Sequence, residues 1–152
     1  MDEVSKLIGQ RNTMLFWVAI SFAVWQGGQL ADEIVHLRGW GTEMSNLVIP
    51  FAVLIGALGW VAAMIMMLNY ASKLGRSRKQ AVIQDEAYGQ DQAKAFRIGY
   101  ITLIAVISGL MAVDLMIDFT ASIAIRILLI VGISVPILVF ASINRADAEE
   151  AA

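Results

Sequence analysis

Four long apolar runs alternate with polar segments along the chain, and this pattern predicts four membrane-spanning helices. The runs cover residues 13–37, 46–70, 98–118 and 121–143. Each is long enough, because a helix needs about 20 mostly apolar residues to cross a hydrocarbon core of roughly 30 Å. We therefore expect a single membrane domain over residues 1–152, built as an all-α, integral membrane four-helix bundle.

Small residues in the second run predict a close contact with a neighbouring helix. Ala52, Gly56, Gly59 and Ala63 recur at spacings of three and four residues. Small side chains placed in this way let two helix backbones approach each other, and van der Waals contact drives helix association in lipid.

The longest polar segment in the interior of the sequence, residues 73–97, separates the two apolar halves. It holds six of the eleven Lys and Arg residues, and it contains no proline. Alanine, glutamine and glutamate are frequent in this segment and favour a helix. The segment is therefore expected to form a cytoplasmic helical linker that runs directly into the third span and extends it beyond the membrane.

The distribution of positive charge predicts how the chain is threaded. Nine of the eleven Lys and Arg residues lie in the two tails and the central segment, whereas the other two connections hold only Arg38 and Arg126. An excess of basic residues near the ends of spans is typical of the cytoplasmic side. We therefore expect both termini and segment 73–97 to be cytoplasmic, in a multi-pass protein of the bacterial inner membrane.

Composition narrows the classes of function. The chain is 59% hydrophobic and 16% charged and has a net charge of −2, so it lacks the overall basic surface of a protein that binds nucleic acid directly. It has one histidine, no cysteine and no nucleophile in a recognisable order with a base. We therefore expect no catalytic residues, no enzymatic activity and no cofactor other than a candidate divalent cation.

A polar cluster at the outer ends of the first and third spans is the strongest candidate for a metal site. In the first span, Gln29 and Glu33 fall on one helix face with two of the candidate ligands, and residues three or four apart share a face. Because the first and third spans run in the same direction, three carboxylates and one imidazole stand at the same membrane face. Such a set suits a divalent cation. The four candidate ligands are Asp32, His36, Asp114 and Asp118.

The same residues have a second interpretation in which no metal binds. Asp114 lies about one turn inside the outer end of its helix, and Arg126 lies about as deep in the next helix, across a tight turn. Charges within a membrane usually pair, so we expect an ion pair between Asp114 and Arg126. Charged residues at span ends also extend toward water. Asp32, His36 and Asp118 would then be solvated rather than bound to an ion.

The central segment carries a narrow apolar stripe that favours a protein contact. Ala81, Tyr88 and Ala95 are seven residues apart, and Phe96 lies beside them. A helix with such a stripe packs on its own neighbours or on a partner, so packing within a homo-oligomer or against the N-terminal tail remains an alternative. The residues expected at a partner contact are Lys79, Tyr88, Lys94, Phe96 and Arg97.

The run from Gln84 to Tyr100 resembles a stretch of uncharacterised bacterial four-helix inner-membrane proteins. In both, an acidic pair, here Asp85 and Glu86, precedes a basic and aromatic segment that enters a span. Some of these proteins accompany small helix-turn-helix regulators. The resemblance therefore implies a membrane partner for a transcription factor.

Two functions follow as expectations. The first is a small non-enzymatic interaction or regulatory protein that lies in the lipid bilayer, forms a homo-oligomer and presents segment 79–97 to a cytoplasmic protein partner. The alternative is a cation-binding or cation/proton-translocating protein that uses the outer Asp and His residues. The two functions differ in which side of the membrane carries the activity.

Overall fold

The computed structural model describes residues 3–76, 86–117 and 120–150 of the chain. Over these residues the regular structure is entirely helical, and four helices are each long and apolar enough to cross a membrane. The helices are α1 (Glu3–Arg38), α2 (Glu43–Arg76), α4 (Glu86–Asp114) and α5 (Ala121–Glu150). The predicted all-α class and the four apolar helices are confirmed.

The apolar stretches lie close to the predicted ones. Within the described residues they run over Gly9–Arg38, Ser45–Ser72, Gly89–Asp114 and Ala121–Asn144. The third helix ends earlier than predicted, at Asp114. There the N–H groups of Met116 and Ile117 both donate to the carbonyl of Val113 at 2.9 Å, so the chain closes into a turn. Asp118, the predicted last residue of this span, lies outside the described residues.

Local hydrogen bonds set the turn between α1 and α2. Gly39 has a φ of +63°, a conformation in which glycine meets no steric penalty, and the N–H of Trp40 donates to the carbonyl of Val35 at 3.1 Å. At the start of α2, the N–H of Thr42 donates to Ser45 Oγ at 2.8 Å and the N–H of Ser45 donates to Thr42 Oγ1 at 3.2 Å. This exchange satisfies N–H groups that have no partner inside the helix.

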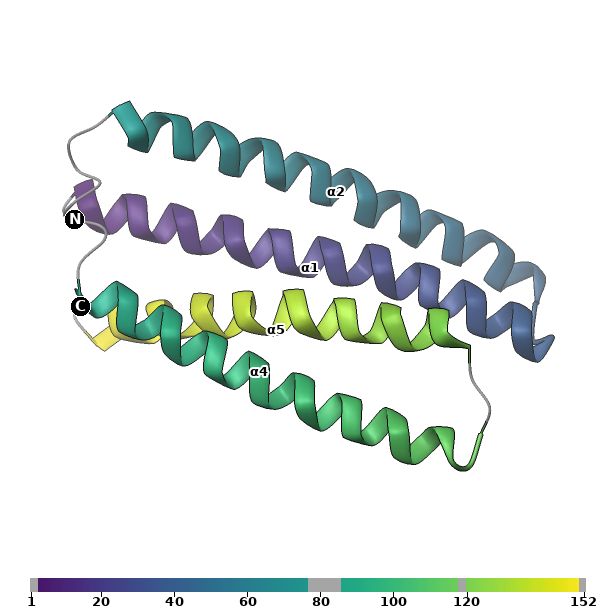
Figure 1. Cartoon of the computed structure of the whole chain (residues 1–152). Coiled ribbons are helices and arrows are strands. Elements are labelled where there is room, and N and C mark those ends of the chain that lie inside the picture. Colours follow the sequence, from purple (N-terminus) through teal and green to yellow (C-terminus); the bar gives the residue numbers. More distant parts are fainter. Residues whose placement is uncertain (1–2, 77–85, 118–119, 151–152) are drawn as a thin grey trace.

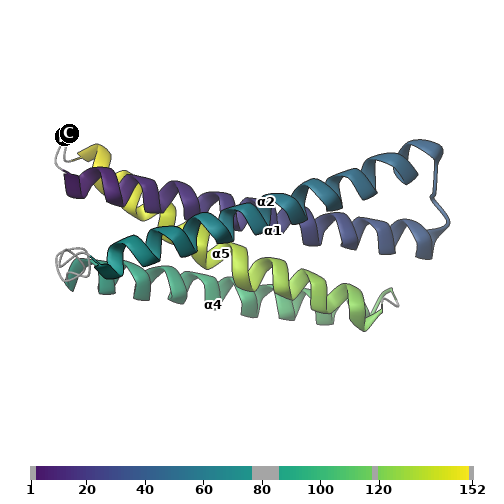
Figure 2. The same cartoon turned by 90° about the horizontal axis from the view of Figure 1, so that it is seen from above.

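The helices pack antiparallel in a row whose order is α2, α1, α5, α4 (Figure 1). The main interfaces are α1 with α2, α1 with α5 and α4 with α5. Neighbouring helices are inclined to one another (Figure 2). Along the helix axes, the start of α1 and the end of α5 lie at one end of the bundle. The α1–α2 turn lies at the opposite end, which we call the turn end (Figure 1).

The α1–α2 interface is formed by small residues and aromatic rings. A Cβ added to Gly56 would lie only 2.5 Å from the backbone nitrogen of Trp25, and one added to Gly59 would lie 3.2 Å from Cβ of Ser21. The rings of Trp25 and Trp60 stack with their centroids 5.5 Å apart. The small residues predicted to bring a neighbour close therefore face α1.

Polar contacts cross the α1–α5 interface. Ser134 Oγ donates to the carbonyl of Ala19 at 3.3 Å in the middle of the helices. Toward the end opposite the turn end, Arg11 donates to Asn144 Oδ1 at 3.4 Å, and its guanidinium carbon lies 5.5 Å from the centre of the Phe140 ring. Hydrogen bonds of this kind between helices satisfy polar groups that lipid cannot.

Large apolar side chains cover the outward surfaces of α2 and α4. Leu58 and Leu68 on α2 are 62% and 65% exposed, and Ile101 and Met111 on α4 are 60% and 68% exposed. Proteins that live in water seldom expose so continuous an apolar surface. This surface is consistent with a multi-pass membrane protein, in which lipid chains cover the outward side chains.

Candidate functional site

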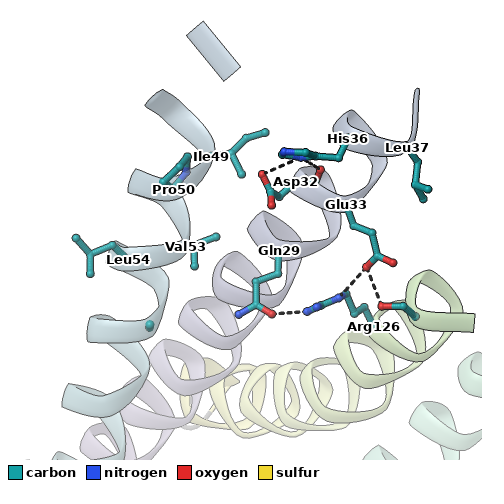
Figure 3. Close-up of a pocket in the computed structure, with 12 residues that line it drawn as sticks. Gln29, Asp32, Glu33, His36, Leu37, Ile49, Pro50, Val53, Leu54 and Arg126 are labelled. Carbon is teal, nitrogen blue, oxygen red and sulfur yellow. Dashed lines mark hydrogen bonds and ion pairs between the residues drawn. The ribbon is translucent and has the colours of Figure 1, made fainter. Parts of the chain in front are cut away.

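A pocket of about 1030 Å³ lies at the turn end, between α1, α2 and α5 (Figure 3). Its wall on α1 is mainly polar and comprises Gln29, Asp32, Glu33, His36 and Leu37. Its wall on α2 is apolar and comprises Ile49, Pro50, Val53, Leu54 and Ala57. From α5 it is lined by Ser122 and Arg126. We call this cavity the turn-end pocket.

Arg126 binds two side chains of α1 at the edge of this pocket. Its Nε donates to Glu33 Oε2 at 3.1 Å in an ion pair, and its Nη1 donates to Gln29 Oε1. The side chains of Arg126 and Glu33 are 29% and 22% exposed, so both are largely enclosed by the protein. The pair fixes the first turns of α5 against the last turns of α1.

Two hydroxyl groups complete the surroundings of Glu33. Thr120 Oγ1 donates to Oε1 at 2.9 Å, and Ser122 Oγ donates to Oε2 at 2.8 Å. Together with Arg126, these donors bind both oxygens of the carboxylate. Glu33 therefore serves as a structural anion, since a largely enclosed carboxylate is stabilised by a counter-ion and by hydrogen bonds.

The ion pair expected between Asp114 and Arg126 requires correction, because the structure pairs Arg126 with Glu33. Asp114 is exposed at the end of α4 and has no ion pair within the described part of the chain. The physical reason is the order of the row. At the turn end α4 and α5 diverge, whereas α1 lies against the first turns of α5 (Figure 1).

Asp32 and His36 lie together on α1, as their spacing predicts. His36 Nδ1 donates to the backbone carbonyl of Asp32 at 2.9 Å and lies 3.5 Å from Asp32 Oδ1. The side chains of His36 and Asp32 are 72% and 52% exposed, and both project toward the α2 side of the pocket (Figure 3). The Asp32 carboxylate is therefore accessible to a ligand.

The structure does not gather the four candidate metal ligands in one place. Asp32 and His36 line the turn-end pocket, but Asp114 is not part of its wall and Asp118 lies outside the described residues. Among the described residues, no three His, Asp or Glu side chains are grouped closely enough to hold a metal ion. The metal site therefore stays a prediction.

Of the residues predicted at the partner contact, those that the structure describes lie in the first half of α4. Ala95 is 1% exposed, and a Cβ added to Gly99 would lie 2.5 Å from Cγ of Pro136 on α5. Phe96 and Tyr100, one position further along, are 59% and 66% exposed. Lys94 and Arg97 are also exposed; Lys79 lies outside the described residues, as does the side chain of Tyr88.

Sequence reasoning missed the role of Glu33 and Gln29. It placed both on one face of the first span but assigned neither a partner. A usable signal was present, because an acid and an amide four residues apart can together bind one guanidinium group, and Arg126 is the cation predicted at the same membrane face.

Comparisons of the chain with protein-family models, with curated proteins and with solved structures found no match. The class that the fold and the site define is a helical protein with four candidate membrane spans in its described residues and, among three of them, a pocket with one polar and one apolar wall.

Proposed function

We propose that the chain is a small, non-enzymatic interaction or regulatory protein of the bacterial inner membrane. In this proposal, the start of α4 and the polar segment before it face the cytoplasm and contact a protein partner. The observation that carries the proposal is the division of the start of α4 into two faces. Ala95 and Gly99 pack on α5, while Phe96 and Tyr100 point away from it.

The outward face has the composition of a protein contact. Aromatic side chains and arginine are enriched at the centres of interfaces, and exposed Phe96, Tyr100 and Arg97 lie within five residues of one another. Lys94 adds a second cation. This mixture suits a partner that offers an apolar groove with acidic groups at its rim. A second copy of the chain or a small helix-turn-helix regulator are the candidates that the sequence suggests.

The test removes two aromatic side chains of the predicted contact, Phe96 and Tyr88, which both lie in the first half of α4. In the Phe96→Ala, Tyr88→Ala double variant, membrane insertion should be normal, because neither residue lies in the centre of a span. The oligomer size in mild detergent, or the set of proteins cross-linked to the chain, should change. Phe51→Ala is the matched control, since Phe51 is 60% exposed on α2, away from this face. An unchanged oligomer and an unchanged cross-linked set would contradict the proposal.

The second candidate function, cation binding or cation/proton translocation, is favoured by the accessible Asp32 carboxylate in the turn-end pocket. Titration of the purified protein with Mn²⁺ and with Zn²⁺ tests it directly by calorimetry. Loss of binding in both Asp32→Asn and His36→Ala would support a metal site there. Equal binding in the wild type and both variants would refute a divalent metal site in this pocket.

A further inference from the structure

We infer that the turn-end pocket binds an amphiphile that carries a cationic ammonium head group and an apolar chain. This inference rests on the second candidate function and names the class of cation for the same pocket. It follows from the charge of the pocket, from the shortage of ligands for a bare metal ion, and from the division of the pocket into a polar and an apolar wall.

The formal charges of the side chains that line the pocket add up to one net negative charge. With His36 counted as neutral, three of the pocket's lining residues carry a formal charge, namely Asp32, Glu33 and Arg126. Glu33 and Arg126 neutralise each other in their ion pair. Within the described part of the chain, the one charged contact of the Asp32 side chain is the long 3.5 Å contact with His36, whose Nδ1 already donates to the backbone carbonyl of Asp32. One positive charge on a ligand would therefore complement the pocket.

These residues offer few free ligands to a divalent metal ion. A zinc site uses three or four protein ligands, and the described residues contain no group of three or more His, Asp and Glu side chains that could supply them. Both oxygens of Glu33 already accept hydrogen bonds from Thr120, Ser122 and Arg126. An organic monocation has smaller demands, because one carboxylate can neutralise it and apolar surface can bind the rest of the molecule.

The apolar wall supplies that surface. From Pro50 to Ala57 it follows α2 for about 10 Å, at roughly 1.5 Å of rise per residue. It ends at Ala57, where the helices close on each other, since a Cβ added to Gly56 would lie 2.5 Å from the backbone nitrogen of Trp25. Asp32 stands across from this wall, on α1 (Figure 3). A head group beside Asp32 would thus direct an attached chain along α2, and the volume of about 1030 Å³ is ample for both.

The experiment uses the full chain in phosphatidylcholine nanodiscs and measures binding of dodecyltrimethylammonium, whose charge is permanent. Dodecyl sulfate is the anion with the same chain, and empty nanodiscs report partition into lipid alone. The wild type should bind the cation saturably at one site and show no such binding of the anion. Asp32→Asn should weaken binding of the cation about tenfold or more, because a charge pair near a protein surface is worth several multiples of the thermal energy. Asp32→Glu should retain binding.

Asp114→Asn is the matched control. It also removes one negative charge at the turn end, but from a residue that does not line the pocket. It should leave the affinity for the cation unchanged. Ala57→Phe should reduce the affinity by filling the apolar wall. Equal affinities in Asp32→Asn and Asp114→Asn, or comparable binding of dodecyl sulfate, would overturn the inference. If Mn²⁺ or Zn²⁺ binds through Asp32 and the amphiphile does not, the second candidate function stands and this inference fails; if neither binds, both fail.

Discussion

Replacing Gly56 with alanine should force α1 and α2 apart where they are closest. The added Cβ would lie 2.5 Å from the backbone nitrogen and 2.7 Å from Cα of Trp25. The backbone of a continuous helix cannot move aside as the tip of a side chain can. To restore an ordinary contact of 3.4 Å from 2.5 Å, the two helices must separate locally by about 0.9 Å.

The expected loss of stability follows from this separation. A gap of roughly 0.5–1 Å removes about a quarter to a half of the attraction between each pair of atoms in contact. Overpacking of a well-packed interior costs about 1–3 kcal/mol, while the higher helix propensity of alanine returns up to about 1 kcal/mol. We therefore expect Gly56→Ala to lower the free energy of unfolding by up to about 2 kcal/mol, and by about 1–3 kcal/mol relative to a glycine-to-alanine change that meets no neighbour.

Gly27→Ala provides the matched control, because nothing lies within 4 Å of a Cβ at Gly27 and the change in helix propensity is the same. It should be neutral or stabilising. Reversible unfolding in mixed micelles, driven by sodium dodecyl sulfate and followed by tryptophan fluorescence, measures both variants, and Trp25 and Trp60 report directly on this interface. If Gly56→Ala is as stable as Gly27→Ala, the close contact between α1 and α2 does not exist as described.

Two further predictions concern the polar residues and the orientation. Glu33→Gln and Arg126→Gln should each lower the free energy of unfolding in the same assay. The double variant should lose less stability than the two single losses added together, because the two side chains form one ion pair. Strictly additive losses would argue against the pair. In intact cells, a membrane-impermeant thiol reagent should label Thr42→Cys and spare Ser77→Cys, since the chain has no cysteine of its own and segment 73–97 is expected to be cytoplasmic. Labelling of Ser77→Cys from outside would reverse the proposed orientation.

The number of helices and one of their contacts could be predicted from the sequence because both depend on local composition. An apolar run of about 20 residues has few alternatives to a spanning helix. Likewise, Gly56 and Gly59 lie three residues apart on one helix face, so a single close neighbour explains both. Such properties follow from the period of the helix and do not require knowledge of which neighbour is present.

The partner of Arg126 could not be predicted in the same way, because it depends on the order of the helices. Asp114 is near Arg126 in the sequence, across one short connection, and equal depth made that pair plausible. Glu33 is the partner because α1, and not α4, lies against the first turns of α5 at the turn end. In a membrane the lipid chains are as apolar as the side chains, so hydrophobicity alone does not select a neighbour.

The order of the row has a consequence for how the protein can be assembled. The helices α2 and α4, which are consecutive in the described sequence, lie at opposite edges, and the main contact between the two halves is α1 with α5. Each half is a pair of helices that are long and apolar enough to cross a membrane, and the ion pair of Glu33 with Arg126 joins one half to the other. Two separately synthesised fragments, cut between residues 76 and 86, should therefore find each other in the membrane and reconstitute the turn-end pocket without a covalent link.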